Sequence, residues 1–338
     1  MTLPPQPTGS ATEERFDGPS LSPSRAADFK TCPLLFRFRT IDKLPEQPTP
    51  DQLRGTLVHA VLERLFDLPA GERTPAAAAE LVAPEWERLV AAEPELAALF
   101  ARPEPPVLDG MPLAEAERLA AFFDSARGLL EGYFAVEDPS RLEPAEREAL
   151  VSTLVDERLL IRGYVDRLDV SPAGDLRVVD YKTGGAPREA FEGRALFQLK
   201  FYALVLWRTR GVVPRVLRLL YLRDQEICDY SPDAGELERF ERTLMALSQA
   251  IERARADKHF VAKPSRLCGW CSHQAFCPEF GGTPPPYPEP APPADAPAAD
   301  TTQTVDAQTL DAPTADAPAA PAPATPNPAT PNPAEVPA

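Results

Sequence analysis

Two neighbouring segments with alternating apolar residues place the strongest constraint on the fold. Residues 163–169 read Gly-Tyr-Val-Asp-Arg-Leu-Asp and residues 178–184 read Val-Val-Asp-Tyr-Lys-Thr-Gly, with the turn signal Ser-Pro-Ala-Gly between them. This pattern predicts two strands joined by a turn. Side chains two positions apart lie on one face of a strand, so Asp180 and Lys182 point the same way, and Asp166 lies on the adjacent strand. The chain is therefore expected to fold around a sheet that carries two carboxylates and an amine.

The side chains of Asp166, Asp180 and Lys182 suit the chemistry of a metal ion and a phosphate. Hard cations such as Mg²⁺ take oxygen ligands and keep several waters, so two carboxylates and a substrate phosphate suffice to bind one. Such an ion can stabilise the attacking and leaving oxygens of phosphodiester cleavage. Lys182 is expected to act through its ammonium charge, because nearby carboxylates oppose the loss of its proton. Simpler interpretations remain open: Asp166 pairs with Arg167 or another Arg, Asp180 caps a turn, and Lys182 forms only a salt bridge with Asp180.

Periodicity along the rest of the chain predicts the remaining elements. Amphipathic helices are expected at 24–40, 53–67, 75–101, 112–135, 193–210 and 233–257. Three strands in a meander are expected over 150–182 and two more over 214–230. A Pro-rich stretch at 103–107 breaks the helices on either side of it.

Three of the five cysteines lie close together, at Cys268, Cys271 and Cys277. A two-residue spacer lets two thiolates reach one metal, and a third ligand follows after five residues. Iron–sulfur clusters and structural zinc both accept four thiolates, so a fourth ligand has to come from elsewhere. His273 would complete a zinc site. Cys228 falls in a predicted strand and is expected to be a small buried apolar residue.

Taken in order, these motifs resemble the PD-(D/E)xK nuclease superfamily, specifically RecB-like exonucleases and the related CRISPR adaptation nucleases. The resemblance covers roughly residues 20–280 and rests on Ser22-Pro23-Ser24 with Phe29, Cys32-Pro33 and Phe36; Gly55-Thr56-Leu57-Val58-His59 with Leu62-Glu63; Gly163 to Asp166; Asp180 to Lys182; Gln198 with Tyr202; and Cys268-x-x-Cys271-x5-Cys277. It implies an α/β fold with a restriction-endonuclease-like core, in which helices flank a mixed central sheet. It further implies a helical insertion at 75–135 and a C-terminal iron–sulfur region at 264–280.

The resemblance also implies roles for individual residues. The catalytic set would be His59, Asp166, Asp180, Lys182, Gln198 and Tyr202, and its first three members would hold the metal ion. The ion would be Mg²⁺ or Mn²⁺, with a slight preference for Mn²⁺ because imidazole is a softer ligand. Glu63, one helical turn after His59, either orients its ring or is a surface carboxylate. Tyr202 either positions substrate with Gln198 or packs into the core. A [4Fe–4S] cluster would be held by Cys32, Cys268, Cys271 and Cys277.

The activity that the resemblance implies is a metal-dependent DNA exonuclease that hydrolyses phosphodiester bonds at single-stranded or duplex ends, in DNA repair or recombination. The sequence contains no Gly-x4-Gly-Lys-Ser/Thr loop, so a helicase would be a separate partner. Two alternatives remain: a non-catalytic module that binds DNA ends or a helicase, and a CRISPR spacer-processing nuclease that uses the same chemistry.

Charge and composition qualify this interpretation. The formal net charge is −16, but seven acidic residues lie in 282–338, which has no Lys or Arg, and phosphate binding depends on local charge. Residues 1–19 and the Pro/Ala-rich tail at 281–338 are expected to be disordered, because they cannot bury enough apolar surface to offset the entropy of ordering. The domain would then span 20–280. No apolar run is long enough to span a membrane and no signal peptide is recognisable, so a cytoplasmic protein is expected.

Overall fold

The computed structural model describes residues 16–46, 48–101, 107–108, 111–112, 115–186 and 192–288. The sequence predicts disorder at 1–19 and 281–338, of which residues 1–15 and 289–338 fall outside the described residues, as does most of the Pro-rich stretch at 103–107. Within the described part of the second segment, the Tyr287 ring stacks on Phe260. The predicted domain boundaries stay predictions. Within the described part of the chain, no helix combines the length and the apolar character needed to cross a membrane.

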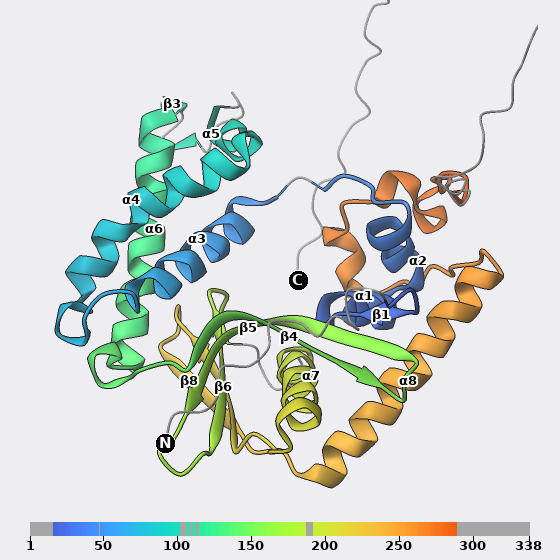
Figure 1. Ribbon diagram of the computed structural model, residues 1–338. Coiled ribbons are helices and arrows are strands. Elements are labelled where there is room, and N and C mark those ends of the chain that lie inside the picture. The colour runs from blue at the N-terminus through green and yellow to red at the C-terminus, as the bar shows by residue number, and fades with distance from the viewer. Residues whose placement is uncertain are drawn as a thin grey trace, which may run out of the picture. The chain divides into compact units, whose positions relative to one another are not determined.

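Most of the helices precede the main strands along the chain, and Figure 1 shows where these elements lie. The helices are α1 (Pro23–Thr31), α2 (Pro33–Phe36), α3 (Pro50–Leu65), α4 (Pro75–Ala92), α5 (Ala98–Ala101), α6 (Glu115–Val136), α7 (Glu192–Arg210) and α8 (Ala234–Ala256). The strands are β1 (Ser20–Leu21), β2 (Val107–Leu108), β3 (Met111–Pro112), β4 (Glu146–Val155), β5 (Leu159–Val170), β6 (Leu176–Lys182), β7 (Val216–Tyr221) and β8 (Glu226–Tyr230). The predicted strand meander, the two later strands and the helices that follow each of them are confirmed.

Two of the predicted helices are interrupted. The helix expected over 24–40 ends at Thr31, because Cys32 adopts an extended backbone with φ −158° before Pro33. The ring of a proline disfavours the helical conformation of the residue before it. A short helix and a π-helical turn, Arg37–Ile41, then continue the chain. The helix expected over 75–101 ends at Ala92 for the same reason, because Pro94 follows.

Six strands form one mixed sheet in the order β1-β5-β6-β7-β8, and β4 pairs with the other edge of β5. β5 is antiparallel to β4 and β6 and parallel to β1, while β6 and β7 are parallel. Along the edge that faces β6, β5 pairs with β1 at Leu160 and Ile161 and with β6 from Arg167 onwards. Among the described strands, residues 162–166 therefore have no neighbour on that edge, which leaves a gap in the sheet.

Helices cover both faces of this sheet. Successive residues of a strand point to opposite faces, and Val178 and Val179 accordingly enter two different cores. The first core contains the apolar side chains of α1, α2, α7 and α8. The second contains those of α3, α4 and α6, which lie together in Figure 1. The predicted α/β fold, a mixed central sheet flanked by helices, is confirmed.

Gly132 allows α6 to pack directly against the end of β7. A Cβ atom at this position would lie 1.9 Å from the backbone oxygen of Leu222, which is closer than any non-bonded contact allows. At Gly128, one turn earlier on the same helix, a Cβ atom would have nothing within 4 Å of it. Helix α6 therefore contacts the sheet backbone to backbone, and a side chain at Gly132 would force α6 and the end of β7 apart.

Candidate active site

The gap between β5 and β6 brings the predicted acidic residues together. Past the pair Arg167–Val179 the two strands no longer form a ladder. There the Asp166 carboxylate replaces the missing backbone partner, and its Oδ2 accepts a hydrogen bond of 2.8 Å from the Tyr181 backbone N–H. Asp180 precedes this position on β6 and is 1% exposed. The two carboxylates thus lie on either side of the point where the sheet opens.

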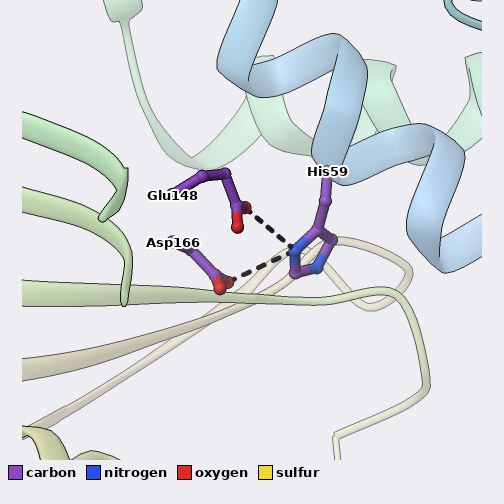
Figure 2. Close-up of side chains that lie close together, drawn as sticks. All are labelled: His59, Glu148 and Asp166. Atoms are coloured by element: carbon purple, nitrogen blue, oxygen red, sulfur yellow. Dashed lines mark ion pairs between the residues drawn. The ribbon is translucent and has the colours of Figure 1, made fainter. Parts of the chain in front are cut away.

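His59 reaches this point from α3. The helix approaches closely because residue 55 is glycine: a Cβ there would lie 3.1 Å from Thr183 Oγ1. The Nε2–H of His59 donates to the Tyr181 carbonyl at 2.9 Å. Its Nδ1 lies 3.5 Å from Asp166 Oδ2 and 3.8 Å from Glu148 Oε1 (Figure 2). The Tyr181 carbonyl, Asp166 and Glu148 therefore orient His59. Glu63 lines the same hollow as His59 but is not one of these contacts.

The electrostatics of this cluster favour an added positive charge. Burial lowers the pKa of His59, but contact with Glu148 and the negative charges of Asp166 and Asp180 outweigh it and raise this pKa to about 9. Burial and the charge of Asp180 raise the pKa of Asp166 to about 7, although His59 and the Tyr181 N–H oppose that shift. Without a bound cation, the cluster therefore holds protons at neutral pH.

Glu148 is the member of this cluster that the sequence did not predict. Its φ of +41° is a left-handed backbone conformation, which is uncommon for a residue other than glycine. At Glu148, the side chains of β4 switch from one face of the sheet to the other. The Arg147 side chain donates to the Glu63 carbonyl on α3, whereas Val151 lies in the first core. In a regular strand, both would lie on one face. The irregular residue thus directs its carboxylate towards His59.

Three further side chains form a hydrogen-bonded chain beside the acids. Lys182 Nζ lies 2.5 Å from Asp180 Oδ2 and donates to Gln198 Oε1 at 3.0 Å. Gln198 Nε2 donates to the Tyr202 hydroxyl at 3.1 Å. Tyr202 is 4% exposed and packs on Gly163, where a Cβ would lie 2.7 Å from its ring. Tyr202 therefore packs into the core and also fixes the amide that holds Lys182.

Arg167 does not pair with Asp166. Its side chain is fully buried, and its guanidinium donates to both carboxylate oxygens of Glu137, the residue that follows α6, at 2.6 and 2.9 Å. It also donates to the Tyr181 hydroxyl at 2.9 Å. Because the backbone of Tyr181 contacts both Asp166 and His59, this buried ion pair holds in place the strand segment on which the acidic cluster depends.

Two hollows open beside the residues of the site. The first, which we call the α3 hollow, has a volume of about 730 Å³ and is lined in part by His59, Glu63, Glu148 and Tyr164. The second, the α1 hollow, has a volume of about 920 Å³ and is lined in part by Arg162, Tyr164, Lys182, Gln198 and Tyr202. His59 and Glu148 therefore line one hollow and Lys182 lines the other, and Tyr164 lines both.

The donor atoms present suit a divalent cation. One ligand atom each from His59, Glu148 and Asp166 lies within 4.8 Å of the other two. Two carboxylates and an imidazole are ligands that Mg²⁺ and Mn²⁺ accept. Asp180 is not part of this trio, but its charge acts on both His59 and Asp166. The residues therefore fit a divalent metal, and the trio contains Glu148, which the sequence did not suggest, in place of Asp180, which it did.

The cysteine residues lie apart from this cluster. Cys32 Sγ accepts a hydrogen bond of 3.4 Å from the Lys263 N–H, and Cys268 Sγ accepts one of 3.2 Å from the Ser265 N–H. Burial raises the pKa of Cys271, and the thiols of Cys277 and Cys32 raise it further. Among the described residues, no three cysteine sulfurs lie within 4.8 Å of one another. A closed cysteine site is therefore not formed.

The zinc alternative involving His273 is not supported. Its Nε2 lies 2.6 Å from Glu46 Oε1, its ring contacts Phe38 edge-on, and it joins no cluster of three ligand atoms among the described residues. A tetrahedral zinc site with bonds of about 2.3 Å would also place its sulfurs about 3.8 Å apart. Cys228 on β8 is half-buried and packs against the first core.

Residues 20–278 match the family model described as the PD-(D/E)XK nuclease superfamily. The chain belongs to this superfamily. No curated protein matches it in sequence. Among solved structures, it is similar to the Eubacterium rectale protein called "Putative exonuclease", with a TM-score of 0.45 and 10% identity over 78% of this chain and 90% of that one. It is also similar to SSO0001, with a TM-score of 0.31 and 15% identity over 56% of this chain and 79% of that one. At these TM-scores, the superfamily assignment rests on the family model alone.

Proposed function

We propose that this superfamily member is a metal-dependent deoxyribonuclease of the RecB-like type, which hydrolyses phosphodiester bonds from DNA ends. The observation that carries the proposal is the convergence of His59, Glu148 and Asp166 beside Lys182 at the gap in the sheet. A cluster of carboxylates next to an amine suits the cleavage of a substrate that is itself an anion. Repair or recombination is the setting that we expect, with any helicase supplied by a separate chain.

A divalent ion, Mg²⁺ or Mn²⁺, would be held by His59, Glu148 and Asp166, with Asp180 adding negative charge next to it. When bound, it would supply Lewis-acid stabilisation of the charge on the reacting phosphate. His59 must release its proton before it can act as a ligand. The Tyr181 carbonyl, which accepts from His59 Nε2, fixes the ring so that Nδ1 faces the carboxylates.

The side chains around Lys182 explain how it would act. Asp180 and Gln198 hold its ammonium group from two sides, so the charge is fixed before substrate arrives. A positioned ammonium stabilises negative charge that develops on phosphate oxygens without reorganisation of solvent. Tyr202 holds Gln198 in turn. In this assignment, Lys182 is the electrostatic catalyst and the two residues on α7 are its positioning residues.

The test is digestion of linear single-stranded and duplex DNA labelled at one end, with Mg²⁺, with Mn²⁺ and with EDTA. We expect metal-dependent shortening from the ends by the wild-type chain, and loss of at least a hundredfold in rate for Lys182→Ala. Lys200→Ala is the matched control, because Lys200 lies on α7 but pairs with Glu236 outside the site. Absence of cleavage by metal-loaded wild type, or equal rates for wild type and Lys182→Ala, would refute the assignment and favour a DNA-binding module.

We also propose that Cys32, Cys268, Cys271 and Cys277 hold a [4Fe–4S] cluster. Support comes from the backbone N–H groups directed at two of the sulfurs and from the proximity of the two ends of the domain, since Lys263 contacts both Cys32 and the Lys30 carbonyl. Such a cluster would close a loop of more than 200 residues, a constraint on the order of 5 kcal/mol in the chain-entropy model.

Protein purified without oxygen is the material for testing the cluster. Iron and acid-labile sulfide are expected at four per chain, with broad visible absorption that Cys268→Ala abolishes and Cys228→Ala keeps. Retention of full iron content in Cys268→Ala would contradict this ligand assignment.

A further inference from the structure

Two large apolar side chains next to the candidate active site are left uncovered. Tyr164 on β5 is 58% exposed and Leu150 on β4 is 54% exposed. They lie directly opposite each other in the antiparallel ladder, so they form one patch. The second core covers the neighbouring strand residues Val179 and Tyr181, but it does not extend over this pair. An exposed apolar patch beside a polar site indicates that a ligand covers it.

The position of Tyr164 relates the patch to the reaction. Tyr164 is two residues from Asp166 on β5, and it lines both the α3 hollow with His59 and the α1 hollow with Lys182. A phosphate held between the metal ligands and Lys182 would therefore have Tyr164 beside it. The nucleotide attached to that phosphate would lie over the phenol ring and the Leu150 side chain.

Positive charge continues from this patch into the α1 hollow. Arg162, two residues before Tyr164 on β5, is exposed and lines that hollow. Lys182 and Arg39 line it as well, and Arg39 is paired with Asp28 and Glu46. An exposed guanidinium beside the patch attracts the phosphates of a polyanion.

We propose that Tyr164 and Leu150 form a stacking subsite for one unpaired base next to the scissile phosphate, and that Arg162 binds the phosphate that follows. This inference rests on the proposed nuclease function and assigns its substrate: a single strand, or the unpaired strand of a frayed end. An aromatic ring can stack on any base, so the subsite would select for an unpaired base and not for sequence. In an intact duplex, the base face is already covered by its neighbours.

Single-stranded oligonucleotides with one abasic position, moved along the strand from the labelled end, test the stacking subsite. Binding is measured in the Lys182→Ala background with Mg²⁺, and cleavage in the wild-type background. One abasic position should weaken binding about 5- to 150-fold in the presence of Tyr164. Tyr164→Ala should weaken binding of the intact strand to a similar extent, and the two changes together should cost no more than either alone. Tyr164→Phe keeps the ring and should behave like the unsubstituted protein.

Two further variants separate stacking from charge. Arg162→Gln should weaken binding equally at every abasic position and reduce the salt dependence of binding by about one phosphate contact. Ile227→Ala removes a similarly exposed apolar side chain from β8 and should change nothing. Thermal unfolding of each variant checks that it is folded.

The outcomes distinguish this inference from the function on which it rests. If wild type cleaves DNA but no abasic position depends on Tyr164, or if blunt duplex is cleaved as fast as single strand, the stacking subsite is refuted and the nuclease assignment stands. If wild type neither binds nor cleaves DNA with metal present, both are refuted.

Discussion

Replacing Glu148 by Gln tests the part of the metal centre that the fold supplies and the sequence does not reveal. The substitution keeps the shape of the side chain and removes its charge. Glu148 Oε1 lies 3.8 Å from His59 Nδ1, and the two side chains are about one-third exposed. We expect Mn²⁺ or Mg²⁺ to bind the variant about 10- to 100-fold more weakly, and cleavage at subsaturating metal to fall to the same extent.

The magnitude follows from the geometry. Two unit charges about 4 Å apart attract by about 1 kcal/mol in water and about 4 kcal/mol at an effective dielectric constant of about 20. Partial exposure places Glu148 nearer the lower figure, and the double charge of the ion raises it to about 2 kcal/mol. At about 1.4 kcal/mol per factor of ten, that energy corresponds to about 30-fold in the dissociation constant. Loss of a ligand-supporting group elsewhere has a comparable effect.

Isothermal titration of metal into the protein measures this change directly. Glu63→Gln is the matched control, because it removes the same charge from the same hollow but not from a group that contacts His59. Its effect should be no more than about threefold, as expected for a partly screened charge. Equal affinities for Glu148→Gln and Glu63→Gln would show that Glu148 is not a ligand, and that its left-handed backbone has another cause.

Three further predictions concern the site and the fold. Metal binding at pH 8 should release protons, because His59 with a pKa of about 9 is still protonated. Proton release is measured as a dependence of the binding heat on the ionisation enthalpy of the buffer. Proton release that does not diminish above pH 9 would contradict this prediction. Both raised pKa values make the metal-free protein less stable as pH rises. The stabilisation from His59 is complete below about pH 6.5 and is lost as pH rises through 9. The stabilisation from Asp166 is complete below about pH 4 and is lost as pH rises through 7. Gly132→Ala should lower the melting temperature by several degrees, since its Cβ would lie 1.9 Å from the Leu222 oxygen, whereas Gly128→Ala should raise it slightly through helix propensity; equal melting temperatures for the two variants would show that α6 does not dock as described.

The parts of the site that could be predicted are those set by local periodicity. Asp180 and Lys182 fall on one face because their strand is regular, and the helical spacing of four brings Gln198 and Tyr202 together. The pairing of His59 with Asp166 came from the ordered motifs of a known family, since no local rule joins α3 to β5. The interruption at Cys32 was missed even though Pro33 signals it, because the apolar spacing on both sides continues in helical phase.

Glu148 and Tyr164 could not be predicted because they depend on a break in periodicity. The strand was expected to begin at residue 150, so Glu148 lay outside it and had no assigned face. Alternation alone gives Tyr164 a face, but not whether a helix covers that face. The second core includes Tyr181 but not Tyr164, and the Tyr164 ring is therefore left exposed.

The break in periodicity also explains why the charges gather at one point. In a regular antiparallel pair, side chains alternate, so Asp166 and Arg167 would be directed to opposite faces. Here, Arg167 reaches α6 and the second core, while Asp166 is directed into the gap beside His59. A left-handed residue other than glycine costs on the order of 1–3 kcal/mol, and it persists only if its surroundings hold it. Arg147 bound to α3 on one strand and Arg167 bound to Glu137 on the other supply that hold on both sides of the break. Removing the interactions of either arginine should therefore separate His59, Glu148 and Asp166 before the sheet unfolds. The reason is that a return to regular alternation relieves the backbone strain at Glu148.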